Sequence, residues 1–345
     1  MKAYVLDGIN QLHLKEVPMP VVQKGEVLVQ VKAAGICGSD IPRIFKTGTY
    51  HFPTIPGHEF SGKVVESKNS AWAGKRVGIF PLIPCHSCAP CKKKQYEMCR
   101  NYSYLGSRTD GGFAEYVAVP EDNLIELPEA VSYEAAAMLE PMSVAVHAMR
   151  SARLNPEQSV AVCGLGTIGM FLVMFLKEAG VEHLYVIGNK EFQHRKVIEM
   201  GIPEAAYCDS RSADPYEWLM EQTGGMGVDA FFECVGKNET ITQAIRLTAP
   251  GGTVELVGNP ATDMSFDKDT YWKILRNQLT VKGNWNSSFA HDAEDDWHYV
   301  MERLADGRIQ PEQYITQRLD FEELEEGLRI MRDKSEEYLK VMITC

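Results

Sequence analysis

The strongest fold signal in this sequence is the stretch Ser159-Val-Ala-Val-Cys163-Gly164-Leu165-Gly166-Thr167-Ile168-Gly169. It joins a short apolar run, typical of a buried strand, to the pattern G-x-G-x-x-G and then to an apolar helical stretch. Gly164 permits a tight turn, Gly166 lets the backbone approach a pyrophosphate, and Gly169 lets helix and strand pack closely. The helix start, at Thr167 and Ile168, offers amide donors to phosphate. The pattern predicts a dinucleotide site; the alternative is a glycine-rich turn in an α/β domain that binds no nucleotide.

Strands and helices alternate after this stretch. Apolar runs of strand length cover residues 183–187, 228–233, 253–257 and 279–283, and a helical pattern covers 191–200. This alternation predicts βαβ units around a doubly wound parallel sheet, a Rossmann domain, over residues 146–286.

The second strand of this domain lacks the acidic residue that usually ends it. That residue would bind the adenosine ribose hydroxyls, but here Gly188 is followed by Asn189 and Lys190, with Arg195 further on. Loss of the carboxylate removes an anchor for NAD and a source of repulsion against a 2′-phosphate, which Lys190 or Arg195 would bind. Alternatively, both cations are solvated helix charges and NAD binds through other contacts. The sequence therefore leaves NAD and NADP both open.

The flanking segments differ from this domain. Residues 26–32 and 115–119 alternate or nearly alternate in polarity, as half-buried strands do, and glycines and prolines interrupt the first third of the chain. In the tail, Asp320 and Glu323 begin a predicted amphipathic helix, and 339–343 form a predicted strand. We predict that residues 1–145 and 287–345 together form a β-rich second domain.

A short cysteine-rich run lies inside this β-rich domain. Its spacing is C-x2-C-x2-C-x7-C, formed by Cys85, Cys88, Cys91 and Cys99. Four soft thiolates close together suit one tetrahedral zinc ion and leave no position open for a substrate. The pattern therefore predicts a structural zinc site. The alternatives are a disulfide-linked loop and a ferredoxin-like cluster with a displaced fourth cysteine.

A second group of metal-ligand residue types lies in Cys37-Gly-Ser39-Asp40 and Gly57-His58-Glu59. Cys37, His58 and Glu59 offer a thiolate, an imidazole and a carboxylate, a mixture that suits zinc with an open position. Glu140 is a further candidate ligand. On spacing alone, a buried core cysteine and a hydrogen-bonded core histidine are the commoner explanation.

Bulk properties narrow the function classes. The 345 residues are 45% hydrophobic and 24% charged, with a net charge of −12. An acidic chain is a poor partner for nucleic acid. No apolar stretch is long enough to cross a bilayer, and the first residues do not resemble a secretory signal. Nine scattered cysteines suit a reducing cytoplasm.

Taken together, these motifs resemble the medium-chain zinc-dependent alcohol dehydrogenase superfamily. They occur in the family's order and over nearly the whole chain: Cys37-Gly-Ser39-Asp40, the His58-Glu59 motif, the four-cysteine run, Glu140-Pro141 and the glycine pattern at 164–169. The resemblance implies a GroES-like β-rich catalytic domain beside the Rossmann domain, and two zinc ions per subunit. It also implies that Cys37, His58 and Glu59 hold the catalytic zinc in the polyol branch, with Glu140 beside the metal, directly or through a water.

Within that branch, the sequence resembles the galactitol-phosphate dehydrogenases. The matching stretches are residues 37–48, 106–116 and 273–281, with the nearby Trp285. The implied reaction is oxidation of a polyol phosphate by NAD or NADP, with galactitol 1-phosphate giving tagatose 6-phosphate as the first candidate. The substrate is expected in the cleft where the dinucleotide and the catalytic zinc meet.

The resemblance and the residue types together suggest further roles. Ser39 is a candidate proton relay, or makes only a turn hydrogen bond, and Glu140 is a candidate for tuning the metal. Arg43 and Lys46 are candidate phosphate ligands, or solvated charges of a helix face. The other candidate substrate contacts are Tyr116, Trp285 and Asn286.

Two other hypotheses compete with a polyol phosphate dehydrogenase. The first is a dehydrogenase of a free polyol such as sorbitol, or of another secondary alcohol. The second is a nucleotide-binding protein that reuses the fold without alcohol chemistry, although the joint presence of Cys37, His58 and Glu59 argues against it. If residues 279–283 form a sheet edge, we expect a homodimer or homotetramer.

Overall fold

The computed structural model describes all 345 residues. The chain divides into two compact units, Met1–Glu140 with Ser288–Cys345, and Pro141–Ser287. The sequence-based boundaries lie close to these, at residue 145 instead of 140 and at 286 instead of 287. Each unit has its own sheet and its own core.

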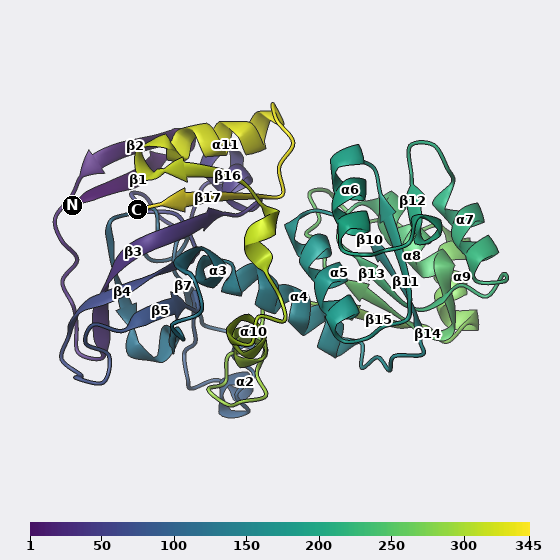
Figure 1. The fold of residues 1–345 in the computed structure, drawn as a ribbon, viewed down its shortest axis with the longest axis horizontal. Helices are drawn as coiled ribbons and strands as arrows, with labels where there is room; N and C mark the ends of the chain where they lie inside the picture. Colours follow the sequence, from purple (N-terminus) through teal and green to yellow (C-terminus); the bar gives the residue numbers. More distant parts are fainter. The chain divides into compact units, whose positions relative to one another are not determined.

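The second unit is built around a six-stranded parallel sheet (Figure 1). Its spatial order is β12-β11-β10-β13-β14-β15, which is the order 3-2-1-4-5-6 of a Rossmann sheet. The strands are β10 (Ser159–Cys163), β11 (His183–Gly188), β12 (Tyr207–Asp209), β13 (Val228–Glu233), β14 (Thr248–Leu256) and β15 (Thr280–Gly283). The predicted parallel sheet is therefore confirmed.

Helices cover both faces of this sheet (Figure 1). They are α4 (Leu139–Ser151), whose first two residues belong to the first unit, α5 (Thr167–Glu178), α6 (Glu191–Glu199), α7 (Pro215–Gln222), α8 (Asn238–Leu247) and α9 (Lys268–Arg276), with the 3-10 turn η4 (Glu204–Ala206). Residues 169–176 of α5 are all buried, as a helix that is apolar on every side must be.

The first unit contains a seven-stranded mixed sheet in the order β16-β17-β3-β4-β5-β9, with β8 also paired to β3. Its strands are β3 (Glu26–Ile36), β4 (Glu59–Ser67), β5 (Arg76–Ile79), β8 (Tyr116–Pro120), β9 (Leu124–Glu126), β16 (Ile315–Asp320) and β17 (Lys340–Thr344). Two small ladders complete it: β1 (Lys2–Gly8) with β2 (Gln11–Glu16), and β6 (Leu82–Ile83) with β7 (Ser103–Tyr104).

Short helices connect these strands. They are α1 (Asp40–Pro42), the π-helical turn η1 (Arg43–Thr47), α2 (Ala89–Lys92), η2 (Tyr96–Met98), η3 (Glu121–Asn123), α3 (Tyr133–Ala137), α10 (Asp296–Ala305), η5 (Pro311–Tyr314), η6 (Phe321–Glu323) and α11 (Leu324–Asp333). The predicted start of the tail helix is confirmed, because the side chains of Asp320 and Glu323 form a capping box. No helix combines the length and the apolar character that a membrane span requires.

Candidate metal centres and dinucleotide site

Two neighbouring strands bring Cys37, His58 and Glu59 together. Cys37 directly follows β3, Glu59 is the first residue of β4, and the antiparallel register pairs Gly35 with Glu59. As a result, one ligand atom of each of the three residues lies within 4.8 Å of the others. His58 and Glu59 are buried and Cys37 is half-buried.

A buried cation lies against this cluster. Lys340, the first residue of β17, is 1% exposed, and its Nζ donates to Glu59 Oε2 and, at 3.1 Å, to the carbonyl oxygen of Ile36. Burial lowers the pKa of Lys340 to about 8, although the charges of Cys37 and Asp40 oppose this. Lys340 therefore anchors one side of the Glu59 carboxylate.

Asp40 forms an ion pair with the Nδ1 side of the His58 ring. Its Oδ1 lies 3.4 Å from His58 Nδ1 and 2.6 Å from Arg43 Nη1, and its Oδ2 accepts from the Cys37 backbone amide at 3.0 Å. Burial would raise the pKa of Asp40, but His58, Arg43 and the Cys37 amide outweigh it and lower the pKa to about 2. Asp40 is therefore an ionised partner that orients the imidazole.

In the protein without a metal, Cys37 and His58 stabilise each other's charged forms. Burial lowers the pKa of His58, but Asp40 and Cys37 outweigh it and raise the pKa to about 10. Burial likewise raises the pKa of the Cys37 thiol, but His58 outweighs it and the net shift is downward. A thiolate is thus favoured at Cys37, which is the form that ligates metal.

Ser39 and Glu140 lie beside this cluster. Ser39 Oγ donates to Cys37 Sγ at 3.3 Å. Glu140 is buried and accepts a hydrogen bond from Tyr104 Oη at 3.2 Å, and the Tyr104 ring lies 5.8 Å from the His58 ring. Burial raises the pKa of Glu140, while His58 and Tyr104 oppose the shift. Glu140 is outside the group of three whose ligand atoms lie within 4.8 Å.

The residues at this cluster fit a zinc ion. One thiolate, one imidazole and one carboxylate form a donor set that zinc accepts while one position stays open. His58 Nδ1 is buried, and its ion-pair partner Asp40 Oδ1, 3.4 Å away, lies outside hydrogen-bond geometry. A cation at the cluster would offset the like charges of Cys37 and Glu59.

The four-cysteine lobe has the geometry of a closed metal site. Its sulfur atoms lie within 4.8 Å of one another, with separations of 3.4 Å between Cys88 and Cys91 and 3.9 Å between Cys85 and Cys91 and between Cys88 and Cys99. Four sulfurs about 2.3 Å from one zinc ion would be about 3.8 Å apart. All four cysteines are free thiols, so a disulfide-linked loop is not what the structure shows.

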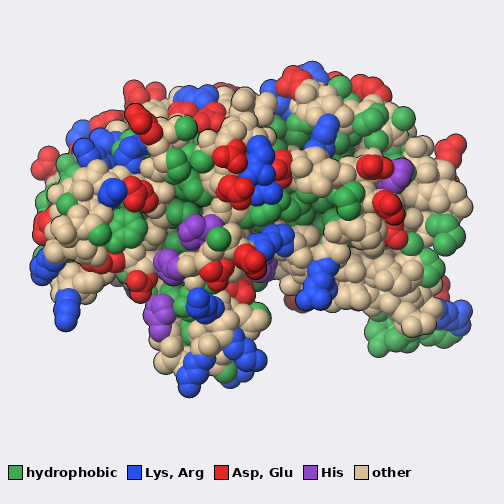
Figure 2. Space-filling model, turned by 60° about the horizontal axis from the view of Figure 1, so that its bottom comes forward, with side chains coloured by type: hydrophobic (Ala, Val, Ile, Leu, Met, Phe, Trp, Pro, Cys, Tyr) green, Lys and Arg blue, Asp and Glu red, His purple; other side chains and the backbone are tan.

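Electrostatics around this lobe also favour a metal thiolate centre. Backbone amides of Cys85 and Asn101 donate to Cys99 Sγ at 3.2 and 3.4 Å. Basic side chains gather on the lobe that carries α2 (Figure 2), where the exposed residues include Lys92, Lys93, Lys94 and Arg100. Four thiolates and one Zn²⁺ carry two net negative charges, which these cations and amides offset.

The glycine-rich turn after β10 is shaped for close approach of a ligand. Gly164 has a φ of +95°, and a Cβ at Gly169 would lie 1.8 Å from the Gly164 carbonyl oxygen, so neither position tolerates a side chain. A Cβ at Gly166, by contrast, would meet no atom within 4 Å. Gly166 is open and directly precedes α5, which suits close approach of a pyrophosphate to the start of this helix.

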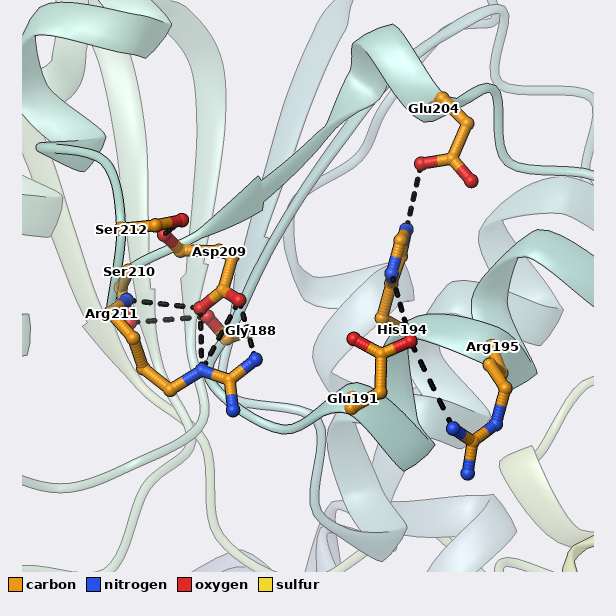
Figure 3. Close-up of polar contacts among 9 residues, drawn as sticks. All are labelled: Gly188, Glu191, His194, Arg195, Glu204, Asp209, Ser210, Arg211 and Ser212. Carbon is orange, nitrogen blue, oxygen red and sulfur yellow. Dashed lines mark hydrogen bonds and ion pairs between the residues drawn. The ribbon is translucent and has the colours of Figure 1, made fainter.

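The residues expected to bind the adenosine ribose lie at the end of β11. Lys190 is the N-cap residue of α6, directly after Asn189. Arg195 lies one turn into α6 and its Nη1 is 3.9 Å from Glu191 Oε1, on the side of Glu191 away from Gly188 (Figure 3). A different cation, Arg211, lies beside Gly188 (Figure 3).

The structure does not gather all of the candidate substrate residues at one point. Arg43 binds Asp40, whereas Lys46 is exposed at the end of the same π-helical turn. Tyr116 pairs with Gln30 on β3, five residues before the Gly35 position and therefore about 17 Å along the strand. Trp285 is 60% exposed and Asn286 is buried in the second unit. The substrate roles of these residues stay predictions.

Sequence reasoning missed Lys340, Arg211 and Tyr207. Lys340 was detectable as the single cation in the apolar run 339–343. Arg211 and Tyr207 belong to the third strand of the Rossmann sheet and the loop after it, a segment that carries no motif. Only the pairing of β12 with β11 places them beside Gly188.

Two family models match this chain. Residues 23–129 match the alcohol dehydrogenase GroES-like domain, and residues 167–306 match the zinc-binding dehydrogenase domain. A galactitol 1-phosphate 5-dehydrogenase of Escherichia coli is 30% identical over 333 residues, which cover 95% of this chain and 96% of that protein. The chain belongs to the medium-chain zinc-dependent alcohol and polyol dehydrogenase superfamily. The fold class predicted from the sequence is thereby confirmed.

Known relatives of this superfamily member differ in substrate and cofactor. The solved E. coli galactitol-1-phosphate dehydrogenase has a TM-score of 0.92 and 29% identity, with full coverage of both chains. A sorbitol dehydrogenase of Bacillus subtilis is 27% identical, covering 99% of this chain and 97% of that protein. A zinc-binding dehydrogenase from Sinorhizobium meliloti, solved with NADP, has a TM-score of 0.89 and 27% identity, covering 100% and 99% of the two chains.

Proposed function

We propose that this member of the superfamily oxidises the secondary alcohol of a polyol phosphate with NAD(P), with galactitol 1-phosphate to tagatose 6-phosphate as the leading candidate. The observation that carries the dehydrogenase chemistry is the convergence of Cys37, His58 and Glu59 within 4.8 Å. In the forward direction one hydride goes to the dinucleotide, one proton goes to solvent, and the alcohol becomes a ketone.

Cys37, His58 and Glu59 would hold the catalytic zinc in this proposal. When bound, zinc supplies a Lewis acid that lowers the pKa of a substrate hydroxyl, and NAD(P) supplies the hydride acceptor. Asp40 keeps His58 oriented, and Lys340 keeps Glu59 in place on the other side. Cys85, Cys88, Cys91 and Cys99 would hold the second zinc, with a structural role.

Ser39 is proposed to relay the proton that the alcohol loses, because its oxygen can accept that proton while its own hydroxyl proton passes on to solvent. Its hydroxyl is already within 3.3 Å of the Cys37 sulfur, so it lies next to the proposed reaction centre and needs no rearrangement to reach it. Glu140 is buried and held by Tyr104, which suits a group that adjusts the charge around the metal and does not leave the site.

Phosphate recognition is proposed for Lys46, with Arg43 as the second cation. Both follow the Cys37 loop on one π-helical turn, and Lys46 is exposed. Arg43 already forms an ion pair with Asp40, and a phosphate would have to compete with that carboxylate. Binding of a phosphate to Lys46 therefore costs less free energy than binding to Arg43. Trp285, Asn286 and Tyr116 remain proposed substrate contacts.

A free polyol such as sorbitol is the second candidate substrate. The pairing of Arg43 with Asp40 favours it, because that pairing reduces the positive charge that is free to bind a phosphate. The similarity to the B. subtilis sorbitol dehydrogenase is in keeping with this alternative.

A steady-state screen of polyols and polyol phosphates, each with NAD and with NADP, tests the proposal. We expect turnover of a polyol phosphate, competitive inhibition by inorganic phosphate, and loss of turnover in Cys37→Ser with dinucleotide binding retained. Turnover of a free polyol without inhibition by phosphate would replace the leading candidate with the second. Holoenzyme that reduces neither NAD nor NADP with any of these compounds would favour a binding protein.

The assembly and the compartment are proposed on separate observations. Strand β15 is the outer strand of its sheet and largely exposed, which suits pairing with a second copy in a homodimer or homotetramer. All nine cysteines are free thiols, as expected for a protein that works in a reducing cytoplasm.

A further inference from the structure

The carboxyl end of β11 has no room for the acidic side chain that usually ends this strand. A Cβ at Gly188 would lie 2.7 Å from Tyr207 Oη and 2.9 Å from Leu165 Cδ1. Tyr207 is the first residue of β12, which pairs with β11 in parallel. A phenol from the neighbouring strand therefore fills the position where an aspartate or glutamate would begin.

The hydroxyl of Tyr207 is an unused donor at this point. Tyr207 is 9% exposed, and its Oη has no hydrogen-bond partner. Burial and the charge of Asp209 raise the pKa of Tyr207 to about 12, so the phenol keeps its proton at any working pH. Its ring is stacked on His194, with centroids 4.1 Å apart, and His194 Nε2 is in turn 2.8 Å from Glu204 Oε2 (Figure 3). This stacking holds the phenol ring, and so its oxygen, in place.

The loop after β12 adds a guanidinium to the same place. Ser210 donates to the Gly188 carbonyl oxygen from its backbone amide at 2.9 Å and from Oγ at 3.1 Å, which ties the loop to the end of β11. Arg211 then lies beside Gly188 (Figure 3), and its Nε and Nη2 donate to Asp209 at 2.9 and 2.5 Å. Its Nη1 has no hydrogen bond, and the side chain is 53% exposed.

The acidic side chains near the end of β11 already interact with basic side chains. Both carboxylate oxygens of Asp209 accept hydrogen bonds from Arg211. Glu191 lies 3.9 Å from Arg195 Nη1 and 3.9 Å from His194 Nδ1. The end of β11 thus offers donors without an available carboxylate, which suits an anionic group better than a ribose hydroxyl pair.

Accepting the dinucleotide site of the proposed function, we propose that this chain selects NADP(H), and that Arg211 and Tyr207 bind the 2′-phosphate. The free Nη1 of Arg211 donates to the phosphate, and Tyr207 Oη gains the acceptor that it lacks. Arg195, the cation one turn along α6, is not required.

Nucleotide fragments test this assignment without turnover. Calorimetric titration of the full chain should show 2′,5′-ADP binding at least about tenfold more tightly than 5′-AMP, since one charge-assisted hydrogen bond is worth about a factor of ten or more. Arg211→Ala should remove most of this difference and leave 5′-AMP binding unchanged. Tyr207→Phe, which keeps the stacking, should reduce the difference several-fold. Arg246→Ala is the matched control, because Arg246 is a similarly exposed arginine that pairs with Asp267 on another part of the unit.

The outcomes separate this inference from the function on which it rests. Equal or tighter binding of 5′-AMP would overturn the inference and leave the dehydrogenase proposal intact. Loss of discrimination in Arg195→Ala, and not in Arg211→Ala, would overturn the role of Arg211. Failure to bind either fragment, NADH or NADPH would refute the dinucleotide site, and both proposals with it.

A reciprocal substitution gives a second measurement. Gly188→Asp alone should not improve 5′-AMP binding, because its Cβ collides with Tyr207 Oη. Gly188→Asp combined with Tyr207→Ala should shift the preference toward 5′-AMP. An improvement in the single variant would contradict the claim that Tyr207 fills this position.

Discussion

At Gly35 a Cβ would lie 2.5 Å from Glu59 Oε2 and 2.6 Å from Lys340 Cε. The central strand β3 therefore carries no side chain at the one point where a carboxylate from β4 meets a lysine from β17. Both partners are buried, so Lys340 depends on Glu59 for compensation of its charge, and Glu59 depends on Lys340 or on a bound metal cation. The absence of a side chain at Gly35 is what allows this pair to form.

Substitution of Lys340 tests that dependence. We expect Lys340→Met to lower the free energy of unfolding of chelator-treated protein by about 3–5 kcal/mol, because it leaves the Glu59 carboxylate buried without a partner. With zinc bound the loss should be clearly smaller, since the metal then compensates Glu59. Denaturant unfolding with and without chelator measures both values. Lys63→Met, on an exposed lysine of β4, is the control, and equal losses in both conditions would contradict the argument.

At the scale of elements, the first turn of α10 contains a pH-sensitive cap. Asp295 is the N-cap residue and accepts from the His298 backbone amide and from His298 Nδ1, both at 2.8 Å. The hydrogen bond to Asp295 raises the pKa of His298 above its ordinary value, against the opposing effect of burial. The charged imidazole is therefore more stable in the folded chain than in the unfolded chain.

The sign of the resulting pH dependence follows from linkage. A raised folded-state pKa contributes stability that is fully present below about pH 6.5 and is lost as the pH rises through the folded value. We expect wild type to exceed His298→Gln in thermal midpoint by more at about pH 5.5 than at about pH 8.5. His183→Gln, which removes an exposed histidine of β11, serves as the control. A gap that is constant with pH would show that the cap does not titrate.

The lobe around α2 is an element that metal binding should hold together. The four thiols lie within 4.8 Å of one another, and the helices that carry them are only short turns, so a zinc ion would supply much of the cross-linking of this lobe. We expect Cys91→Ser to lose one of two zinc ions per subunit and to raise amide exchange in residues 85–100. Metal analysis and hydrogen exchange check this, and an altered hydride-transfer rate at unchanged stability would show that the site is not structural.

At the scale of the whole molecule, the free edge of the Rossmann sheet is the feature that points to assembly. Strand β15 pairs only with β14, and Val281 in it is 40% exposed. We expect Val281→Lys to reduce the oligomer size in light scattering, because a charge on an edge strand opposes pairing with a second copy. Val65→Lys, at an exposed valine inside the other sheet, should leave the size unchanged. A monomeric wild-type protein would refute this proposal.

Local patterns in the sequence were enough to predict the Rossmann sheet, the glycine-rich turn at 164–169 and the four-cysteine lobe. These features depend on residues close together in the chain, where strand and helix periodicity and ligand spacing act locally. The resemblance to the superfamily also made Cys37, His58 and Glu59 candidate metal ligands, and the register of β3 with β4 brings them together.

The surroundings of these residues depend on how distant segments of the chain pack together. Lys340 meets Glu59 across 281 positions of sequence, and Tyr207 fills the place beside Gly188, because strand pairing brings distant segments together. The burial that makes such contacts strong, by excluding water from both partners, does not exist until the sheets have formed. Charge pairing at the cluster and the choice of group beside the ribose are therefore properties of the folded chain, which local spacing does not encode.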